Sequence, residues 1–228
     1  MIEACERSLK NLNTDYIDLY QIHWPSGSFG NEAVPIEETM SALNELKQQG
    51  KIRAVGVSNF SRSQLEEAAR YGRIDSLQPS YSLFWRQVEK DTVPYCIENN
   101  ISILAYCSLA QGLLTGKFGC GHQFEAEDNR SKNKLFKGEN YERAQQALKQ
   151  LRPIAERHQI TLSNLALAWL IAQPQTNAIV GARNPEQAVE NAKATHIHLS
   201  TSDFEDLDAI SRTVTDHLDD NPVLWDWN

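Results

Sequence analysis

The sequence predicts an α/β fold built around a parallel sheet. Short apolar runs alternate with longer amphipathic segments, the apolar runs are rich in β-branched residues, and capping residues begin the amphipathic segments. We count five strand–helix units in a row, preceded by one helix at residues 3–12. Composition alone favours a doubly wound five-stranded sheet, because a (β/α)8 barrel would need three further strands.

The predicted strands are the short apolar runs, each of which ends at a polar residue or a turn signal. Runs of this kind are typical of parallel strands, which helices cover on both faces. They comprise residues 17–23, 52–57, 74–78, 101–106 and 177–180.

Capping residues mark the starts of several predicted helices. Ser61 and Gln64 have the spacing of a capping box. Asn184 stands before a proline that suits the first helical position. Ser202 and Glu205 have the spacing of a capping box for the last helix.

Three other segments complete the predicted organisation. The helix at 36–49 is predicted to end at Gly50, since glycine readily adopts the left-handed conformation that follows a helix. Residues 141–173 predict two consecutive helices with a break near 158–161. Residues 117–140 combine glycines with mixed charges and predict a long, mobile loop, a type of segment that is often functional.

Composition indicates one globular domain, residues 1–228, with a net charge of −8. An acidic chain repels nucleic acid and anionic lipid, so neither is an expected partner. No apolar run has the length of a membrane span. The four cysteines form no CxxC pair, and no secretory signal precedes them, which predicts a cytoplasmic protein.

Polar or aromatic residues end four successive predicted strands. They are His23, Ser58 with Asn59, Gln78 and Tyr106. The carboxyl ends of parallel strands form the ligand-binding face of such folds. A histidine can donate a hydrogen bond to a carbonyl, the Ser, Asn and Gln side chains suit a carboxamide, and a tyrosine ring suits a flat ring. Each residue alone could be a turn or capping residue, but together they predict a nicotinamide site.

The segment after the fifth strand predicts an anion site. It runs from Gly181 through Arg183 into a helix N-terminus, a combination that favours phosphate. The alternative is a surface arginine near a helix cap. No GxGxxG turn is present, so a Rossmann cofactor site is not supported. Cys120 and His122 provide too few ligands for zinc, and no metal site is predicted.

Four ordered segments resemble motifs of the aldo-keto reductases, most closely those of the bacterial general-stress-protein and Tas-like group. They are residues 12–25 (LNTDYIDLYQIHWP), 51–60 (KIRAVGVSNF), 105–118 (AYCSLAQGLLTGKF) and 180–187 (VGARNPEQ). The resemblance implies a (β/α)8 TIM barrel, of which this chain would hold strands four to eight with their helices and lack the N-terminal three βα units. It also implies NADPH as the cofactor and a small-molecule aldehyde or ketone as the substrate.

The resemblance assigns roles to individual positions. His23 matches the histidine of the catalytic tetrad, and Tyr106 matches the aromatic residue that stacks on nicotinamide. The positions matched to cofactor contacts are Ser58, Asn59 and Gln78 for the carboxamide, Ser108, Leu109, Gly112 and Leu114 for the pyrophosphate loop, and Arg183, Gln187 and Asn191 for the 2′-phosphate and adenine, with Gly181 in the preceding turn.

The aspartate, tyrosine and lysine of the family tetrad lie on segments that would precede the first helix, so the chain alone is expected to be inactive. Three hypotheses follow: an oxidoreductase whose sequence is a fragment or has a misassigned start, a non-catalytic NADPH-binding or regulatory module, such as the channel β-subunits of this family, and a gene remnant. Open strand edges would also favour self-association.

Overall fold

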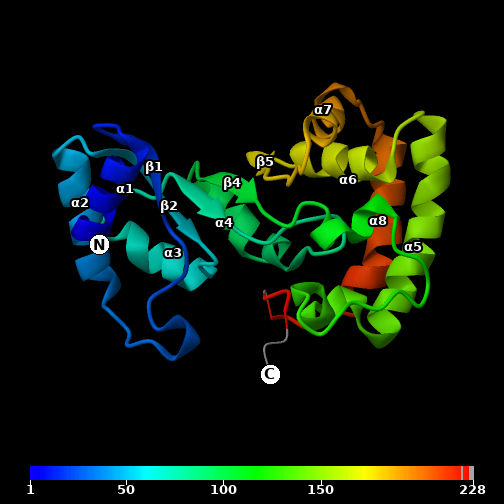
Figure 1. Cartoon of the computed structure of the whole chain (residues 1–228), viewed down its shortest axis with the longest axis horizontal. Coiled ribbons are helices and arrows are strands. Elements are labelled where there is room, and N and C mark those ends of the chain that lie inside the picture. The colour runs from blue at the N-terminus through cyan, green and yellow to red at the C-terminus, as the bar shows by residue number, and fades with distance from the viewer. Residues whose placement is uncertain (222, 226–228) are drawn as a thin grey trace. The chain divides into compact units, whose positions relative to one another are not determined.

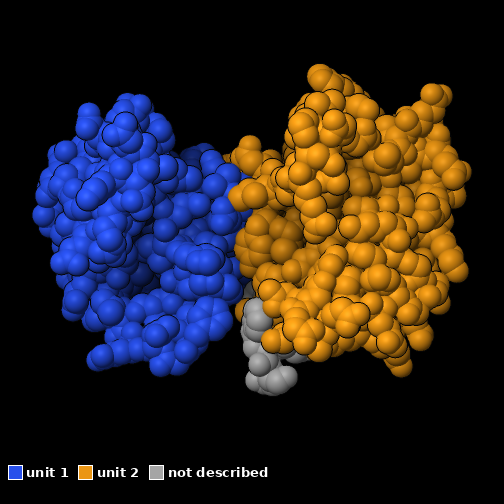
Figure 2. Space-filling model, in the orientation of Figure 1, with its two compact units in different colours: residues 1–79, 91–104 blue, residues 80–90, 105–228 orange. Residues whose placement is uncertain are grey.

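The computed structural model describes residues 1–221 and 223–225. The chain divides into two compact units, shown in different colours in Figure 2. Unit 1 comprises residues 1–79 and 91–104, and unit 2 comprises residues 80–90 and 105–228. No helix in the described residues is long and apolar enough to cross a bilayer.

Unit 1 is built on parallel strands that pair in sequence order (Figure 1). The strands are β1 (Ile17–Ile22), β2 (Ile52–Ser58), β3 (Ser76–Gln78) and β4 (Ser102–Ala105), the last of which continues into unit 2 at Ala105. The helices are α1 (Ile2–Leu12), α2 (Ile36–Gln48), α3 (Arg62–Ala69) and α4 (Thr92–Glu98). A short 3₁₀ turn, η1 (Ser28–Gly30), follows β1.

The core of unit 1 lies between the sheet and these helices. Val57 on β2, Leu77 on β3 and Ile103 on β4 are at most 1% exposed, and Met40 and Leu65 on the helices are fully buried. Burial of such apolar side chains is the main stabilising contribution to a domain of this kind.

Unit 2 is mainly helical. Its longer helices are α5 (Gly138–Arg157), α6 (Leu162–Ile171), α7 (Pro185–Ala192) and α8 (Thr201–Thr215). The 3₁₀ turns among its described residues are η2 (Gln87–Glu89), η3 (Ala110–Thr115), η4 (Asn129–Lys132), η5 (Lys134–Phe136) and η6 (Lys193–His196). Helices α5 and α8 lie side by side (Figure 1).

Strand β5 (Thr176–Ala178) follows α6. The Ile179 amide, just after β5, donates to the Ala105 carbonyl at 2.8 Å. The strand order is β1-β2-β3-β4-β5. The predicted α/β fold with five parallel strands is therefore confirmed.

Most predicted element boundaries lie within a few residues of those observed. Gly50 adopts a φ of +70° directly after α2, which only glycine does without strain. Ser61 and Asn184 cap their helices as predicted. The break between α5 and α6 falls at residues 158–161, also as predicted.

The predicted cap of the last helix was wrong by two residues. Ser200, rather than Ser202, is the N-cap of α8 and forms the capping box with Asp203. Asp203 is 3% exposed and also accepts hydrogen bonds from Arg157 at 2.6 Å and from His158 at 3.0 Å. These tertiary partners, which local spacing does not reveal, explain why the helix begins earlier.

The segment predicted as a mobile loop, 117–140, is packed around aromatic rings. Phe118, Phe124 and Phe136 contact one another edge to face, with ring centroids 4.8–5.7 Å apart. The segment also includes η4 and η5.

The C-terminal tail after α8 packs on this segment. The Lys134 amide donates to the Leu224 carbonyl at 3.1 Å, and the Lys134 ammonium lies 2.8 Å from the Asp219 carboxylate. Leu224 is fully buried. Trp225 pairs with Asn133 in an isolated antiparallel bridge, while Trp227 lies outside the described residues.

The outer edge of β1 is the basis of our first prediction. Among the described residues β1 pairs only with β2, and its Leu19 and Ile22 are partly exposed. An apolar strand with a free edge pairs readily with another chain. We therefore expect the 228-residue chain to self-associate, as measured by size-exclusion chromatography with light scattering.

Leu19→Lys should reduce this association, because a charge on an edge strand opposes pairing. Tyr71→Lys changes an exposed residue that lies outside the strands, and it should leave the association unchanged. A monomeric wild-type chain with one cooperative unfolding transition would show that the edge is not used.

Candidate functional site

The predicted carboxamide-binding residues of unit 1 meet at the ends of β2 and β3. Ser58 pairs with Gln78 in the strand register, and its hydroxyl donates to the Gln78 carbonyl at 2.7 Å. The Asn59 amide group donates to the Ser58 hydroxyl and to the His23 carbonyl, each at 3.0 Å. All four predicted residues of unit 1 are therefore joined by hydrogen bonds.

Backbone geometry at Asn59 supports a functional role for this cluster. Its φ is +61°, in the left-handed region that costs a non-glycine residue about 1 kcal/mol or more. The conformation turns its side chain back to His23, which follows β1 and is exposed. The imidazole of His23 is thus accessible at the carboxyl end of the sheet, where a carbonyl could accept a hydrogen bond from it.

Unit 2 contains a cavity of about 780 Å³ at the carboxyl ends of β4 and β5. It is lined by every cofactor-binding residue predicted in this unit except Tyr106 and Leu114, namely Ser108, Leu109, Gly112, Gly181, Arg183, Gln187 and Asn191. We call it the β4–β5 cavity. Leu114 is 1% exposed and belongs to the core, because the turn of η3 directs it inward.

The segment after β4 forms one wall of the cavity in a strained conformation. Cys107, Ala110 and Gln111 all have positive φ values between 48° and 54°. Strain of this kind is often concentrated at ligand-binding sites. The Ser108 hydroxyl lies 2.8 Å from the Ala105 carbonyl and 2.9 Å from the Ile179 carbonyl, so it ties this wall to the segment after β5.

The opposite wall is the turn that leads into α7. The Arg183 amide donates to the Gln187 side chain at 2.8 Å, and the Gln187 amide donates to the Asn184 side chain at 2.8 Å. Asn191 donates to the Gly181 carbonyl at 3.3 Å. These hydrogen bonds shape the turn, whereas the Arg183 guanidinium forms no ion pair with any described residue, so it is available to an anion.

Three cations line the β4–β5 cavity, although the chain as a whole is acidic. They are Lys117, Arg130 and Arg183, of which Arg130 is paired with Asp128. Glu190 is the one acidic residue among the described residues of the lining. The Arg130 guanidinium lies 4.4 Å from the Phe124 ring centroid and makes two hydrogen bonds to the Asp128 carboxylate from Nε. A concentration of cations in a hollow of an acidic protein is typical of an anion-binding site.

The sequence prediction missed several residues of this cavity. Lys117 and Arg130 belong to the segment predicted as a mobile loop, and Glu190 stands one position before Asn191. The only sequence signal for the two cations was their place in a long loop beside a predicted phosphate motif. Thr161 and Ser163, at the start of α6, also line the cavity.

Electrostatics in unit 2 argue against nucleophilic chemistry there. Burial raises the pKa of the Cys107 thiol to about 12, so it stays protonated near neutral pH and is a poor nucleophile. Hydrogen bonds from Arg130 lower the pKa of Asp128 to about 2, so that carboxylate is ionised. Among the described residues no cluster of His, Cys, Asp and Glu could hold a metal ion.

Tyr106 follows β4, as predicted, but another aromatic ring lies parallel to it. The Tyr106 and Trp225 rings are 6.4 Å apart between centroids and inclined by only 5°. Burial also raises the pKa of the Tyr106 hydroxyl. The C-terminal tail therefore contributes an aromatic side chain beside the residue that the resemblance matches to nicotinamide stacking.

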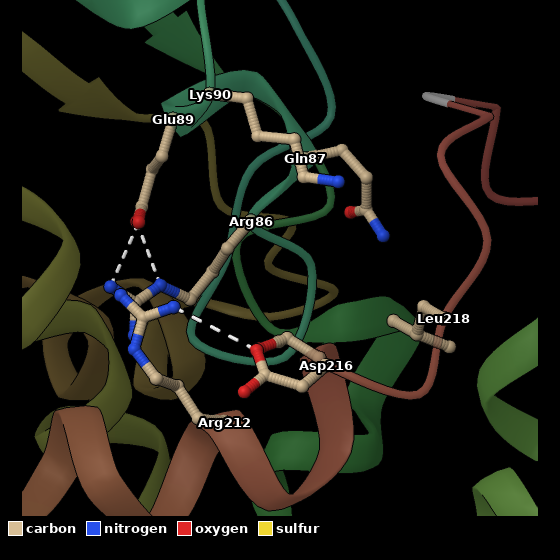
Figure 3. Close-up of a pocket in the computed structure, with 8 residues that line it drawn as sticks. Arg86, Gln87, Glu89, Lys90, Arg212, Asp216 and Leu218 are labelled. Atoms are coloured by element: carbon tan, nitrogen blue, oxygen red, sulfur yellow. Dashed lines mark hydrogen bonds and ion pairs between the residues drawn. The ribbon is translucent and has the colours of Figure 1, made fainter.

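A second cavity in unit 2, of about 260 Å³, is shown in Figure 3. Its cations are already neutralised. Arg86 pairs with Glu89 and Asp208, Arg212 pairs with Asp208 and Asp216, and Lys90 pairs with Asp220. It is therefore a weaker candidate for an anion than the β4–β5 cavity.

The sequence profile of the Aldo/keto reductase family matches residues 1–212. The chain belongs to this family. It is 39% identical to the NADH-specific methylglyoxal reductase of Escherichia coli over 202 residues, which are 88% of this chain and 61% of that protein. The predicted family is thereby confirmed.

Two solved structures of this family are similar to the chain. The glycerol dehydrogenase AKR11B4 from Gluconobacter oxydans is 35% identical, with a TM-score of 0.87 over 95% of this chain and 65% of that one. An aldo-keto reductase from Klebsiella pneumoniae, solved in complex with NADPH, is 29% identical, with a TM-score of 0.70 over 99% of this chain and 67% of that one.

The reductase chain spans less than two thirds of the length of the methylglyoxal reductase and of the glycerol dehydrogenase. Its relatives use NADPH or NADH, as their names and complexes state. The family as a whole acts on small carbonyl compounds.

Proposed function

We propose that this chain binds NADPH through the β4–β5 cavity and provides the cofactor-binding part of a reductase of small aldehydes and ketones. The observation that carries the proposal is the pair of cations, Lys117 and Arg183, that line a cavity in a chain with a net charge of −8 and form no ion pair with any described residue. A dinucleotide with a diphosphate and a 2′-phosphate is a polyanion, so it fits this lining.

Residues of the cavity can be assigned to parts of the cofactor. Arg183, whose guanidinium is free of ion pairs among the described residues, would bind the 2′-phosphate at the start of α7. The segment from Ser108 to Gly112 would lie along the diphosphate. Gln187 and Asn191 would contact the adenosine end.

By the resemblance, Ser58, Asn59 and Gln78 of unit 1 match the contacts of the nicotinamide carboxamide. Tyr106, which belongs to unit 2, matches the aromatic residue that stacks on nicotinamide. When bound, NADPH supplies a hydride to the substrate carbonyl. The role of His23 would be to donate a hydrogen bond that orients and polarises that carbonyl. The five strands would correspond to strands four to eight of a (β/α)8 barrel, with residues 1–228 forming part of a reductase domain in a cytoplasmic protein.

A non-catalytic function is a second candidate. The residues that line the β4–β5 cavity all belong to unit 2. Of the catalytic tetrad, by contrast, the resemblance matches only one residue of this chain, His23. Such a chain would bind NADPH and regulate a partner rather than catalyse reduction. NADPH binding without turnover, even after co-expression with the N-terminal segment of a related reductase, would support this alternative.

Arg183→Ala tests the assignment of the 2′-phosphate. We expect it to weaken NADPH binding roughly 10- to 100-fold, because it removes hydrogen bonds between charged groups, and to change NADH binding little. Fluorescence titration of both dinucleotides measures this difference. Lys149→Ala, which removes an exposed cation of α5 outside the cavity, is the control. Equal losses of NADPH and NADH binding would refute the assignment.

A further inference from the structure

Asn164 is a buried amide in an otherwise apolar stretch of α6. It is 2% exposed, and its neighbours Leu165, Leu167 and Trp169 are also buried. Only half of the amide is used: Nδ2 donates to Oε1 of Glu190 at 2.8 Å, whereas Oδ1 accepts no hydrogen bond in the described part of the chain. A half-satisfied buried amide is less stable than an apolar side chain of similar size, so this one requires an explanation.

The explanation lies at the other end of the contact, where Glu190 lines the β4–β5 cavity. Oε2 of Glu190 lies 2.5 Å from the Lys193 ammonium. The hydrogen bond from Lys193, with a smaller contribution from Asn164, lowers the pKa of Glu190, so its carboxylate is ionised and only accepts hydrogen bonds. Because each oxygen has its own partner, the plane of the carboxylate is fixed.

The two partners of Glu190 differ in how firmly they can hold it. The Lys193 side chain is 60% exposed, so solvent screens its attraction and the long side chain is free to move. Asn164 is enclosed by the core and has a short side chain with few rotamers. The buried amide is therefore the contact that sets the position of the carboxylate.

We propose that Asn164 is a positioning residue of the nucleotide site. It holds the Glu190 carboxylate where the remaining lone pairs accept a hydrogen bond from a donor group on the adenosine end of the dinucleotide. The inference rests on the proposed function, because it requires a nucleotide in the β4–β5 cavity. Asn164 itself does not line that cavity and acts only through Glu190.

Asn164→Leu separates this role from a structural one. Adenosine 2′,5′-bisphosphate is the probe, because it represents the phosphorylated adenosine end of NADPH and needs no nicotinamide site. We expect calorimetry on the full 228-residue chain to show binding weakened roughly 5- to 20-fold, with the melting temperature unchanged or raised. A lower melting temperature with unchanged affinity would assign Asn164 a structural role and overturn the inference.

Two further variants and a control sharpen the test. Asn164→Gln keeps the amide and should restore most of the affinity, whereas Asn164→Asp places a second carboxylate beside Glu190 and should weaken binding most. Gln173→Leu removes an amide that donates to the Trp169 carbonyl at 2.9 Å and does not line the cavity, and it should leave probe binding unchanged.

A measurement without ligand tests the role of Asn164 separately from the proposed binding of NADPH. In an NMR titration of labelled glutamate carboxylates, the pKa of Glu190 should rise in Asn164→Leu, because the carboxylate loses a hydrogen bond that stabilises its charged form. An unchanged pKa, or wild-type affinity in Asn164→Leu, would overturn this inference alone. Failure of the wild-type chain to bind either NADPH or the probe would overturn the proposed function and this inference with it.

Discussion

The purified 228-residue chain is expected to reduce aldehydes at least about 10²–10⁴-fold more slowly than a full-length relative, which is the usual contribution of a general acid. Hydride transfer leaves an alkoxide that must be protonated, and the resemblance places the donor tyrosine outside this chain. Neither Tyr81 nor Tyr106 of unit 2 replaces it. Tyr81 donates to Glu89 at 2.8 Å, and burial raises the pKa of Tyr106.

Loss of NADPH absorbance with methylglyoxal as the substrate measures this rate. Co-expression with the N-terminal segment of a related reductase should raise it, and His23→Ala in that combination should lower it again. Rapid turnover by the 228-residue chain alone would mean that this chain provides its own proton donor, and the expected inactivity would then be wrong.

Arg86→Met is expected to destabilise unit 2 by about 3–5 kcal/mol, the range for breaking a buried ion pair. The Arg86 side chain is 10% exposed and donates to Glu89 at 2.8 Å from both Nε and Nη2, and to Ser211 at 2.7 Å. It also lies 5.0 Å from the Trp169 ring centroid. Methionine keeps much of the volume but leaves the Glu89 carboxylate without its cation.

Arg212→Met is the matched control, since both arginines line the cavity of Figure 3. The Arg212 side chain is 50% exposed and its partners Asp208 and Asp216 are 41% and 60% exposed. Such surface pairs contribute about 0–1 kcal/mol. Urea denaturation monitored by tryptophan fluorescence compares the two variants, and equal losses of stability would show that burial of Arg86 is not the cause.

Local patterns predicted the elements of this fold because each pattern reflects one nearby contact. The apolar run at 52–57 forms a mostly buried strand, and Ser61 needs only Gln64 to cap a helix. The error at Ser202 arose where a distant residue decided the outcome, since Arg157 reaches Asp203 from another helix.

In the candidate site, too, residues that are contiguous in sequence were predicted, whereas residues from distant segments were missed. Arg183 and Gly181 were predicted because turn, charge and helix start are contiguous in sequence. Lys117 and Arg130 were missed because they reach the β4–β5 cavity from a different segment of the chain. The parallel contact of Trp225 with Tyr106 joins residues more than a hundred positions apart, and no local pattern predicts it.

The packing of the C-terminal tail has a consequence for biosynthesis. Lys134 binds Asp219, which lies 85 positions later, and the buried Leu224 follows five positions after that. Domains fold as units while the chain emerges from the ribosome. Unit 2 cannot complete its packing until residues 219–224 have left the ribosome. Until then its earlier segments expose apolar surface, and they are the part of the nascent chain that a chaperone would need to shield.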